Sequence, residues 1–317
     1  SMFGRRLSGT VDFYNNNFSD VLQTRGKSIA LLGASYPTEN IGKQRRSGIE
    51  IELGWQDHIG ALNYYVNGNW TLEKTKMIYM DEQLTPFAYQ RLTGRPLGVT
   101  LGLQCDGFLT AEDIRNGYPV MAGYEAQPGD VKYVDKNNDN VIDEYDRTVI
   151  GGDKPLQYFG LDMGVEYMGI EFSMLWQGVY NRDIYVSDRT LVEGFQTYGQ
   201  SYGQAYRNLL ARWTPETAAT AKYPRLSAGG NTYNYGGMYG SSLWMHKGNF
   251  IRLKNITLAY NLPENWSNNI LGGLRVKVFV SAENALTFSS CDLVDPEVSF
   301  TSSPIQKCFF TGISLNF

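Results

Sequence analysis

Residues 309–317 read Phe309, Phe310, Thr311, Gly312, Ile313, Ser314, Leu315, Asn316, Phe317. Successive side chains of a β-strand point to opposite faces, so the odd-numbered positions form one apolar face and the even-numbered positions, apart from Phe310, a small or polar one. This alternation is typical of a transmembrane β-barrel strand with a polar interior, and also of a half-buried strand in a soluble sandwich. The segment predicts a strand, and the rest of the chain must separate the two classes of fold.

Seven further segments alternate in the same way. They lie at residues 5–19, 49–56, 61–72, 159–167, 170–177, 249–262 and 275–283. Short turns at residues 57–60 and near Gly169 join two pairs of them, which predicts two β-hairpins. With the last segment, the chain is expected to form eight strands.

The connections between these strands fall into a short class and a long class, which alternate along the chain. Short ones lie at 57–60, near Gly169 and at 263–273, and long ones at about 20–42, 77–156, 180–248 and 287–306. All short connections are therefore expected at one end of the sheet and all long ones at the other, as in outer-membrane barrels with short periplasmic turns and long extracellular loops. A candidate strand at residues 96–108 would break this parity, so we place it within a long connection. The pattern predicts an all-β, antiparallel transmembrane β-barrel rather than a soluble sandwich.

Composition excludes several other classes of protein. Aromatic residues make up 14% of the chain, and 22 Tyr and 34 Gly favour β structure with many turns. The net charge of -4 gives no basic field, so nucleic acid is not an expected partner. The chain contains no run of eighteen apolar residues, so the sequence predicts no transmembrane helix. No signal segment follows Ser1, so we expect a mature product or a piece of something longer.

The three cysteines, Cys105, Cys291 and Cys308, lack CxxC spacing. We expect them to be incidental, with a disulfide between Cys291 and Cys308 as the alternative.

Residues 135–147 carry the one pattern with metal chemistry. The expected calcium ligands are the side chains of Asp135, Asn137, Asp139, Asp143 and Asp146 and the carbonyl of Val141, at positions 1, 3, 5, 9, 12 and 7 of a calcium loop. Two positions depart from an EF-hand: Asn140 stands where Gly reaches positive φ more easily, and Asp146 stands where a bidentate Glu is usual. The alternative is a solvated turn held by side-chain to backbone hydrogen bonds. The cofactor prediction is a structural Ca²⁺.

No catalytic constellation is visible, and we expect no enzyme activity. No zinc spacing or phosphate-binding glycine loop is present. Carboxylates such as Glu50 and Glu52 could be imagined as an acid/base pair, but polar residues of this kind line any water-filled barrel. Aromatic residues of the long connections are candidates for stacking on sugars or packing peptide side chains, or else for packing the loops. The candidate substrate-binding residues are Trp213, Tyr233, Tyr235 and Tyr239.

Motifs spread over most of the chain resemble those of SusC/RagA-type TonB-dependent outer-membrane transporters. They lie at residues 128–133, 135–151, 172–185, 212–215, 223–226, 250–255, 281–286 and 295–297. They follow the family's order, and Asn140, where the family usually has Gly, is the main departure.

The resemblance implies more than the residues show. Such proteins are large plugged barrels of the 22-stranded class. They pair with a SusD-like surface lipoprotein, receive energy from TonB, and import oligosaccharides or peptides across the bacterial outer membrane. Residues 1–317 would then be the last eight or so strands of the barrel, with residues 77–156 and 180–248 as extracellular loop insertions. The plug domain and the TonB box would lie outside this chain.

The predicted function is therefore part of a TonB-dependent nutrient importer in contact with outer-membrane lipid. Two alternatives remain open: a small autonomous barrel acting as an anchor or adhesin, and an outer-membrane enzyme that uses carboxylates of the barrel interior.

Overall fold

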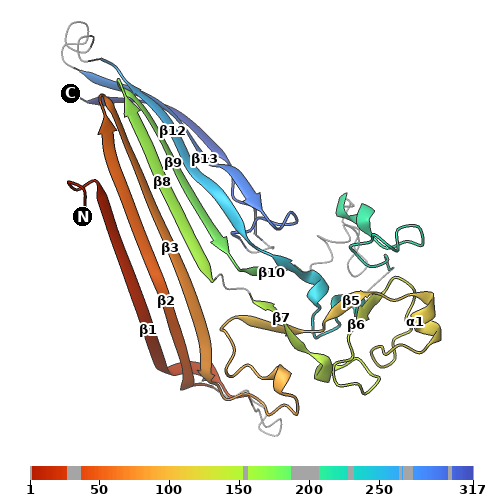
Figure 1. The fold of residues 1–317 in the computed structure, drawn as a ribbon. Helices are drawn as coiled ribbons and strands as arrows, with labels where there is room; N and C mark the ends of the chain where they lie inside the picture. Colours follow the sequence, from red (N-terminus) through yellow and green to blue (C-terminus); the bar gives the residue numbers. More distant parts are fainter. Residues whose placement is uncertain are drawn as a thin grey trace.

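The fold is built on one antiparallel sheet of eight strands, in which each strand pairs with its neighbours along the chain (Figure 1). The computed structural model describes residues 2–26, 37–152, 156–186, 207–227, 232–263, 266, 274–298 and 302–316. The eight strands are β1 (Leu7–Thr24), β2 (Thr38–Ile59), β3 (Leu62–Tyr79), β8 (Gln157–Tyr167), β9 (Ile170–Tyr180), β12 (Phe250–Asn261), β13 (Arg275–Ser289) and β14 (Cys308–Asn316). The prediction of eight strands and two hairpins is confirmed, since β2 pairs with β3 and β8 with β9.

The register of the strand pairs gathers the apolar positions of the sheet on one side, called the apolar face below. Val11 lies opposite Ile51, Ile51 opposite Trp70, and Trp70 opposite Phe159. The pairing of apolar positions continues across the remaining strands to the other edge of the sheet. There the paired positions are Val165 and Phe172, Phe172 and Leu258, Leu258 and Val280, Val280 and Thr311, and Val278 and Ile313. Large side chains on this face are exposed, for example Phe13 at 79% and Leu53 at 54%. An apolar surface of this extent is what lipid covers in a membrane barrel.

The opposite side, called the polar face, carries the intervening residues. Glu52 lies between Thr10 on β1 and Asn69 on β3, and Asn67 lies opposite Asp162 on β8. The other sheets in the described part of the chain are two-stranded and belong to the long connections. No second large sheet among these residues therefore covers either face, which contradicts the sandwich alternative.

Strands β1 and β2 are longer than the alternation predicted. The long connection expected at residues 20–42 was too wide, because β1 runs to Thr24 and β2 begins at Thr38. Pairing continues where both faces are polar, as at Asn17 opposite Arg45, because backbone hydrogen bonds do not need an apolar neighbour once water can bathe both sides. His58 likewise lies inside β2, and the turn after it contains Gly60 at φ +61°.

The long connections after β3 and β9 fold together beyond one end of the sheet, and we call this part the loop domain (Figure 1). It contains β4 (Val99–Gly102) paired with β7 (Thr148–Gly152), β5 (Cys105–Phe108) paired with β6 (Val131–Tyr133), β10 (Asp183–Tyr185) paired with β11 (Met245–Lys247), and α1 (Ala111–Arg115). Single 3-10 turns lie at Ala88–Gln90, Glu144–Asp146, Arg207–Ala211, Tyr233–Tyr235 and Ser242–Trp244. Residues 96–108 thus lie outside the main sheet, as predicted. Among the described residues, no helix is long and apolar enough to cross a bilayer.

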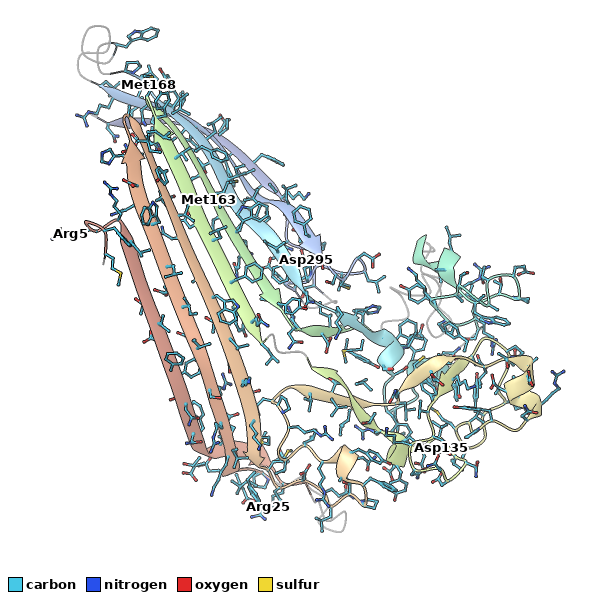
Figure 2. The ribbon with its side chains drawn as sticks, in the orientation of Figure 1. Arg5, Arg25, Asp135, Met163, Met168 and Asp295 are labelled. Carbon is cyan, nitrogen blue, oxygen red and sulfur yellow. The ribbon has the colours of Figure 1, made fainter. Side chains whose placement is uncertain are left out.

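The two ends of the sheet differ in the way the sequence predicted. Figure 2 labels Met168, in the tight turn between β8 and β9, at one end, and Arg25 and Asp135 toward the other. The turn at Met168 needs positive φ at two successive residues, with Met168 at +48° and Gly169 at +84°. Short turns and the loop domain therefore occupy opposite ends of the strands.

The same added charge is expected to destabilise the protein more on the apolar face than on the polar face. Leu53→Arg places a cation on the apolar face, and we expect it to destabilise the membrane-inserted protein by about 2–4 kcal/mol. Glu52→Arg, one residue away on the polar face, is the matched control and should cost less than about 1 kcal/mol. Urea titrations of the full-length protein folded into lipid vesicles measure both. Equal costs for the two variants would contradict the assignment of the faces.

Candidate functional site

The loop domain has its own hydrophobic core, and one of the predicted substrate residues lies inside it. Tyr233 is 2% exposed and packs with Leu103, Val131, Tyr133 and Ile142. Its ring stacks on Tyr124 with centroids 4.0 Å apart and planes 1° apart, and Tyr239 packs against the same cluster. Stacked aromatic pairs stabilise a core beyond their buried area. The structure therefore gives Tyr233 a packing role.

A second aromatic cluster contains Tyr235. Trp244 is fully buried, and its ring lies 4.8 Å from the Tyr235 ring and 6.1 Å from the Tyr223 ring, both nearly parallel to it. The indole N–H of Trp244 donates to the carbonyl of Asn234 at 2.9 Å. These three stacked rings hold the segments after β9 together.

The fourth candidate, Trp213, lies on a glycine. Gly129 adopts φ +90°, and a side chain there would meet the Trp213 ring at 2.3 Å, so only glycine permits this contact. The structure thus brings Trp213, Tyr233, Tyr235 and Tyr239 into one domain, with Trp213 and Tyr239 partly exposed. Their contact with substrate stays a prediction.

Asp130, next to Gly129, is the polar centre of the loop domain and was not predicted as a site residue. Its side chain is fully buried, and Oδ1 accepts from Arg225 Nε at 2.7 Å and Asn234 Nδ2 at 3.1 Å. Oδ2 accepts from the Tyr124 hydroxyl at 2.8 Å and from a backbone N–H at 2.9 Å. Four donors satisfy the carboxylate, which is what a buried charge requires. Asp130 therefore links its own segment to Arg225 and Asn234, which lie 95 and 104 residues farther along the chain.

A signal for this centre was present in the sequence. Asp130 and Arg225 both lie in motifs that carried the family resemblance, at residues 128–133 and 223–226. Sequence spacing alone does not show that two motifs 95 residues apart form an ion pair.

The loop at residues 135–146 is closed by its own acidic side chains. The Asp135 carboxylate accepts backbone N–H groups of Asn138 at 2.7 Å and Asn140 at 2.8 Å, and the Asp146 carboxylate accepts those of Lys136 at 2.6 Å and Asp143 at 2.8 Å. Asn140 reaches φ +65°, so the asparagine at position 6 adopts the conformation that the calcium loop needs there.

These residues present hard oxygen donors, the chemistry that Ca²⁺ prefers. Among the described residues, no Lys or Arg forms an ion pair with Asp135, Asp139, Asp143 or Asp146. Burial raises the pKa of the Tyr89 hydroxyl, and the charges of these same four carboxylates raise it further. The described part of the chain contains no group of three acidic, Cys or His side chains arranged to hold a metal. The carboxylates of the loop instead accept backbone N–H groups. The residue types fit a cation, and calcium binding stays a prediction.

A second buried ion cluster joins the polar face of β12 to the segment after β13. Arg252, 1% exposed, contacts Asp295 at 2.8 Å and Glu297 at 2.9 Å, and Lys254 contacts Glu297 at 2.7 Å. Burial alone would raise the pKa of Asp295, but the backbone N–H of Glu297 and the Arg252 guanidinium outweigh it and lower the pKa. The segment at residues 295–297 is thereby fixed to the barrel wall.

The polar face is hollowed near the short turns. A cavity of about 710 Å³ there is lined by polar-face residues that include His58, Tyr65, Glu166 and Glu171. Glu50 and Glu52 lie farther along β2 and do not line it. A hollow polar wall suits contact with water or with a polar segment of the protein.

Comparisons with known proteins agree with this architecture. A family model described as "TonB dependent receptor-like, beta-barrel" matches residues 2–145. The chain is 23% identical to TonB-dependent receptor P3 of Formosa agariphila, over 100% of this chain and 31% of that protein. It is also 23% identical to TonB-dependent receptor SusC of Bacteroides thetaiotaomicron, over 98% of this chain and 30% of that protein.

Solved structures share the fold. A structure of the RagAB peptide transporter superposes with a TM-score of 0.74 at 20% identity, covering 99% of this chain and 34% of that one. A structure of the RagAB peptide importer in the 'closed-closed' state gives a TM-score of 0.73 at 19% identity, over 99% and 34%. The chain spans about a third of the length of the proteins it matches.

The ion pair at Asp130 predicts an asymmetry between single and double variants. Arg225→Met leaves a buried carboxylate without its cation, and we expect the loop domain to lose about 3–5 kcal/mol of stability. Asp130→Asn combined with Arg225→Met removes both charges and should recover part of that loss. Limited proteolysis of the full-length protein measures opening of the loop domain. Glu125→Ala, an exposed carboxylate in the same domain, is the control, and a double variant as labile as Arg225→Met would contradict the proposed role.

Proposed function

Because the family model, the SusC relative and the RagAB fold together support the SusC/RagA family of TonB-dependent transporters, we propose that this chain is the C-terminal barrel portion of an outer-membrane nutrient importer. In this proposal the apolar face contacts lipid and the polar face lines the path of the substrate. In this proposal the chain performs no catalysis, and its residues bind the cargo, line its path and enclose it.

The observation that carries the proposal is the register of the eight-stranded sheet. In all seven strand pairs apolar residues predominate on one face and polar residues on the other, with Leu175, Phe279 and Phe310 as exceptions on the polar face. A polar wall that lipid does not touch is useful only if water or a polar cargo lies against it. The hollow beside His58 and Glu171 would receive the plug domain that the family places inside its barrels.

The loop domain would lie outside the cell, with residues 77–156 and 180–248 as extracellular insertions. We propose oligosaccharides or peptides as the cargo, and the structural similarity to the RagAB peptide transporter supports the peptide class. Trp213 and Tyr239 would offer partly exposed rings to it, and Tyr233 and Tyr235 would support them from the core. A SusD-like lipoprotein would cover the loop domain, and TonB would act through a segment outside this chain.

We also propose a structural Ca²⁺ in the loop at residues 135–146. The side chains of Asp135, Asn137, Asp139, Asp143 and Asp146 and the carbonyl of Val141 would hold it. The cation would offset four carboxylates that have no basic partner among the described residues. Asn140 at φ +65° supports this proposal, since it removes the main departure of the sequence from a calcium loop.

Transport is tested in cells that lack the full-length gene. We expect uptake of labelled oligosaccharide or peptide to fall to background in the deletion strain and in wild-type cells treated with a protonophore, because import needs TonB energy. Growth on each cargo class as the sole nutrient identifies the substrate. Uptake that survives both treatments would contradict the proposal.

The two alternatives give different results in the same cells. Glu50→Gln with Glu52→Gln should leave uptake intact, whereas an enzyme using these carboxylates would lose hydrolysis of the cargo. An autonomous barrel would fold from residues 1–317 alone into a closed, heat-modifiable form. A portion of a larger barrel needs the remaining strands to close.

Calcium is tested on the full-length protein by calorimetry with CaCl₂ and by terbium luminescence. We expect one site in wild type, and at least about a tenfold weaker site in Asp135→Asn with Asp139→Asn, because two formal charges are removed from the ligand set. Glu112→Gln, an exposed carboxylate on α1, is the control. A wild-type protein that binds neither ion would end the calcium proposal and leave the transport proposal unaffected.

A further inference from the structure

Three basic side chains lie together on the apolar face, near the long-connection end of β2 and β3. We call Arg45, Lys74 and Lys76 the basic cluster. Arg45 is directly opposite Lys76, and Lys74 is two residues along β3 from Lys76. All three alternate in phase with Ile49 and Leu72, so they project from the same side of the sheet as the apolar residues.

Among the described residues, the cluster has no counter-charge. All three side chains are exposed, and none forms an ion pair with any residue in the part of the chain that the structure describes. Arg45 Nε donates to Asn17 Oδ1 at 2.8 Å, a neutral partner. On the polar face of the same strands, Arg46 lies within 3.8 Å of the carboxylate of Glu73. Arg46 on the polar face thus has an acidic neighbour, and the structure describes none for the three basic residues on the apolar face.

Opposed like charges destabilise a strand pair. Side chains directly opposite in an antiparallel pair have Cβ atoms about 4.5–5.5 Å apart, and like charges at such positions repel. Arg45 and Lys76 occupy such a pair, with Lys74 roughly 7 Å farther along the strand. An anion lying between them would convert the repulsion into attraction.

The position of the cluster says what kind of anion fits. The next positions toward the middle of the sheet on this face are Ile49 and Leu72, followed by Ile51 and Trp70. Lys74 therefore lies about 7 Å from the edge of the apolar band, at the level of lipid headgroups. A ligand that touches both surfaces needs acyl chains on one side and negative charge on the other.

We propose that the basic cluster binds a lipid of the outer leaflet whose headgroup carries more than one phosphate, a phosphorylated glycolipid of the lipid A type. The proposal rests on the proposed function for the orientation that puts the loop domain, and hence this end of the strands, outside the cell. Lys74, Lys76 and Arg45 contact the phosphates, and the side chains of Leu72, Ile49 and Trp70 lie along the acyl chains. Three cations spread over about 7 Å suit two phosphates better than one.

The test uses delipidated full-length protein titrated with bisphosphorylated lipid A and followed by native mass spectrometry. We expect Lys74→Gln with Lys76→Gln to raise the Kd about tenfold, since each basic residue near an anionic lipid contributes a several-fold factor. The control, Arg115→Gln with Lys222→Gln, removes the same charge from exposed positions of the loop domain and should leave the Kd unchanged. Equal Kd values for the two double variants would overturn the proposal.

A second titration separates this lipid from any acidic surface. Phosphatidylglycerol carries one phosphate and should bind the wild-type protein more weakly than lipid A. Equal affinity for the two lipids would overturn the assignment to a polyphosphorylated headgroup.

A separate measurement reports on the proposed function. In Met238→Cys, a position 89% exposed in the loop domain, labelling of intact cells by a membrane-impermeant maleimide above the wild-type background places this domain outside. If the wild-type protein bound no lipid A while labelling and uptake were normal, only the lipid proposal would fail. Labelling from the inside alone would defeat the orientation on which both proposals rest.

Discussion

The need to satisfy every backbone N–H and C=O in a medium without water governs the whole sheet. Lipid offers no hydrogen bonds, so a strand there must pair on both sides with other strands. Pairing in turn fixes the register, because a shift of one residue would turn every apolar side chain of that strand to the opposite face. The continuous rows from Val11 through Ile51 and Trp70 to Phe159 are the result, and they leave the polar residues facing inward together. The polar wall that a transporter uses follows from the same constraint that keeps the strands in lipid.

The loop domain follows different physics, that of a small water-soluble protein. It buries Tyr133 against Tyr233 and Trp244 against Tyr235, and it satisfies a buried carboxylate at Asp130 with four donors. The sheet and the loop domain are joined through the same strands, since β3 and β8 lie in the sheet and the connection between them belongs to the loop domain. The Arg252 ion cluster extends this coupling, since it attaches residues 295–297 to the polar face of β12. In the proposed importer, these contacts would hold the loop domain and residues 295–297 at one end of the polar wall.

The strands were predictable from the sequence, and the interior of the loop domain was not. Alternation is local, so a run such as Ile49 to Gln56 reports its own strand, and the parity of short and long connections reports the order of the sheet. Strand ends are less visible, because Asn17 and Arg45 pair as polar residues where the apolar pattern has stopped. The aromatic candidates depended on non-local packing. Nothing in the spacing of Tyr233 distinguishes a ring that meets cargo from a ring that stacks on Tyr124. Asp130 and Arg225 were missed for the same reason, since the bond between them spans 95 residues.

At the edge of the apolar band the strands pass from lipid to water. The placement of charged residues there depends on both surroundings. On the polar face, Arg46 has the acidic neighbour Glu73, because water and protein are the surroundings available to it. On the apolar face, no carboxylate is placed beside Lys74 or Lys76 among the described residues, although a glutamate there would relieve the repulsion at little structural cost. Desolvating an ion pair against lipid is expensive, and a protein carboxylate would also repel phosphate headgroups. A cation at that level gains from the membrane itself, so leaving it without a protein partner is the lower-energy arrangement wherever the surrounding lipid is anionic.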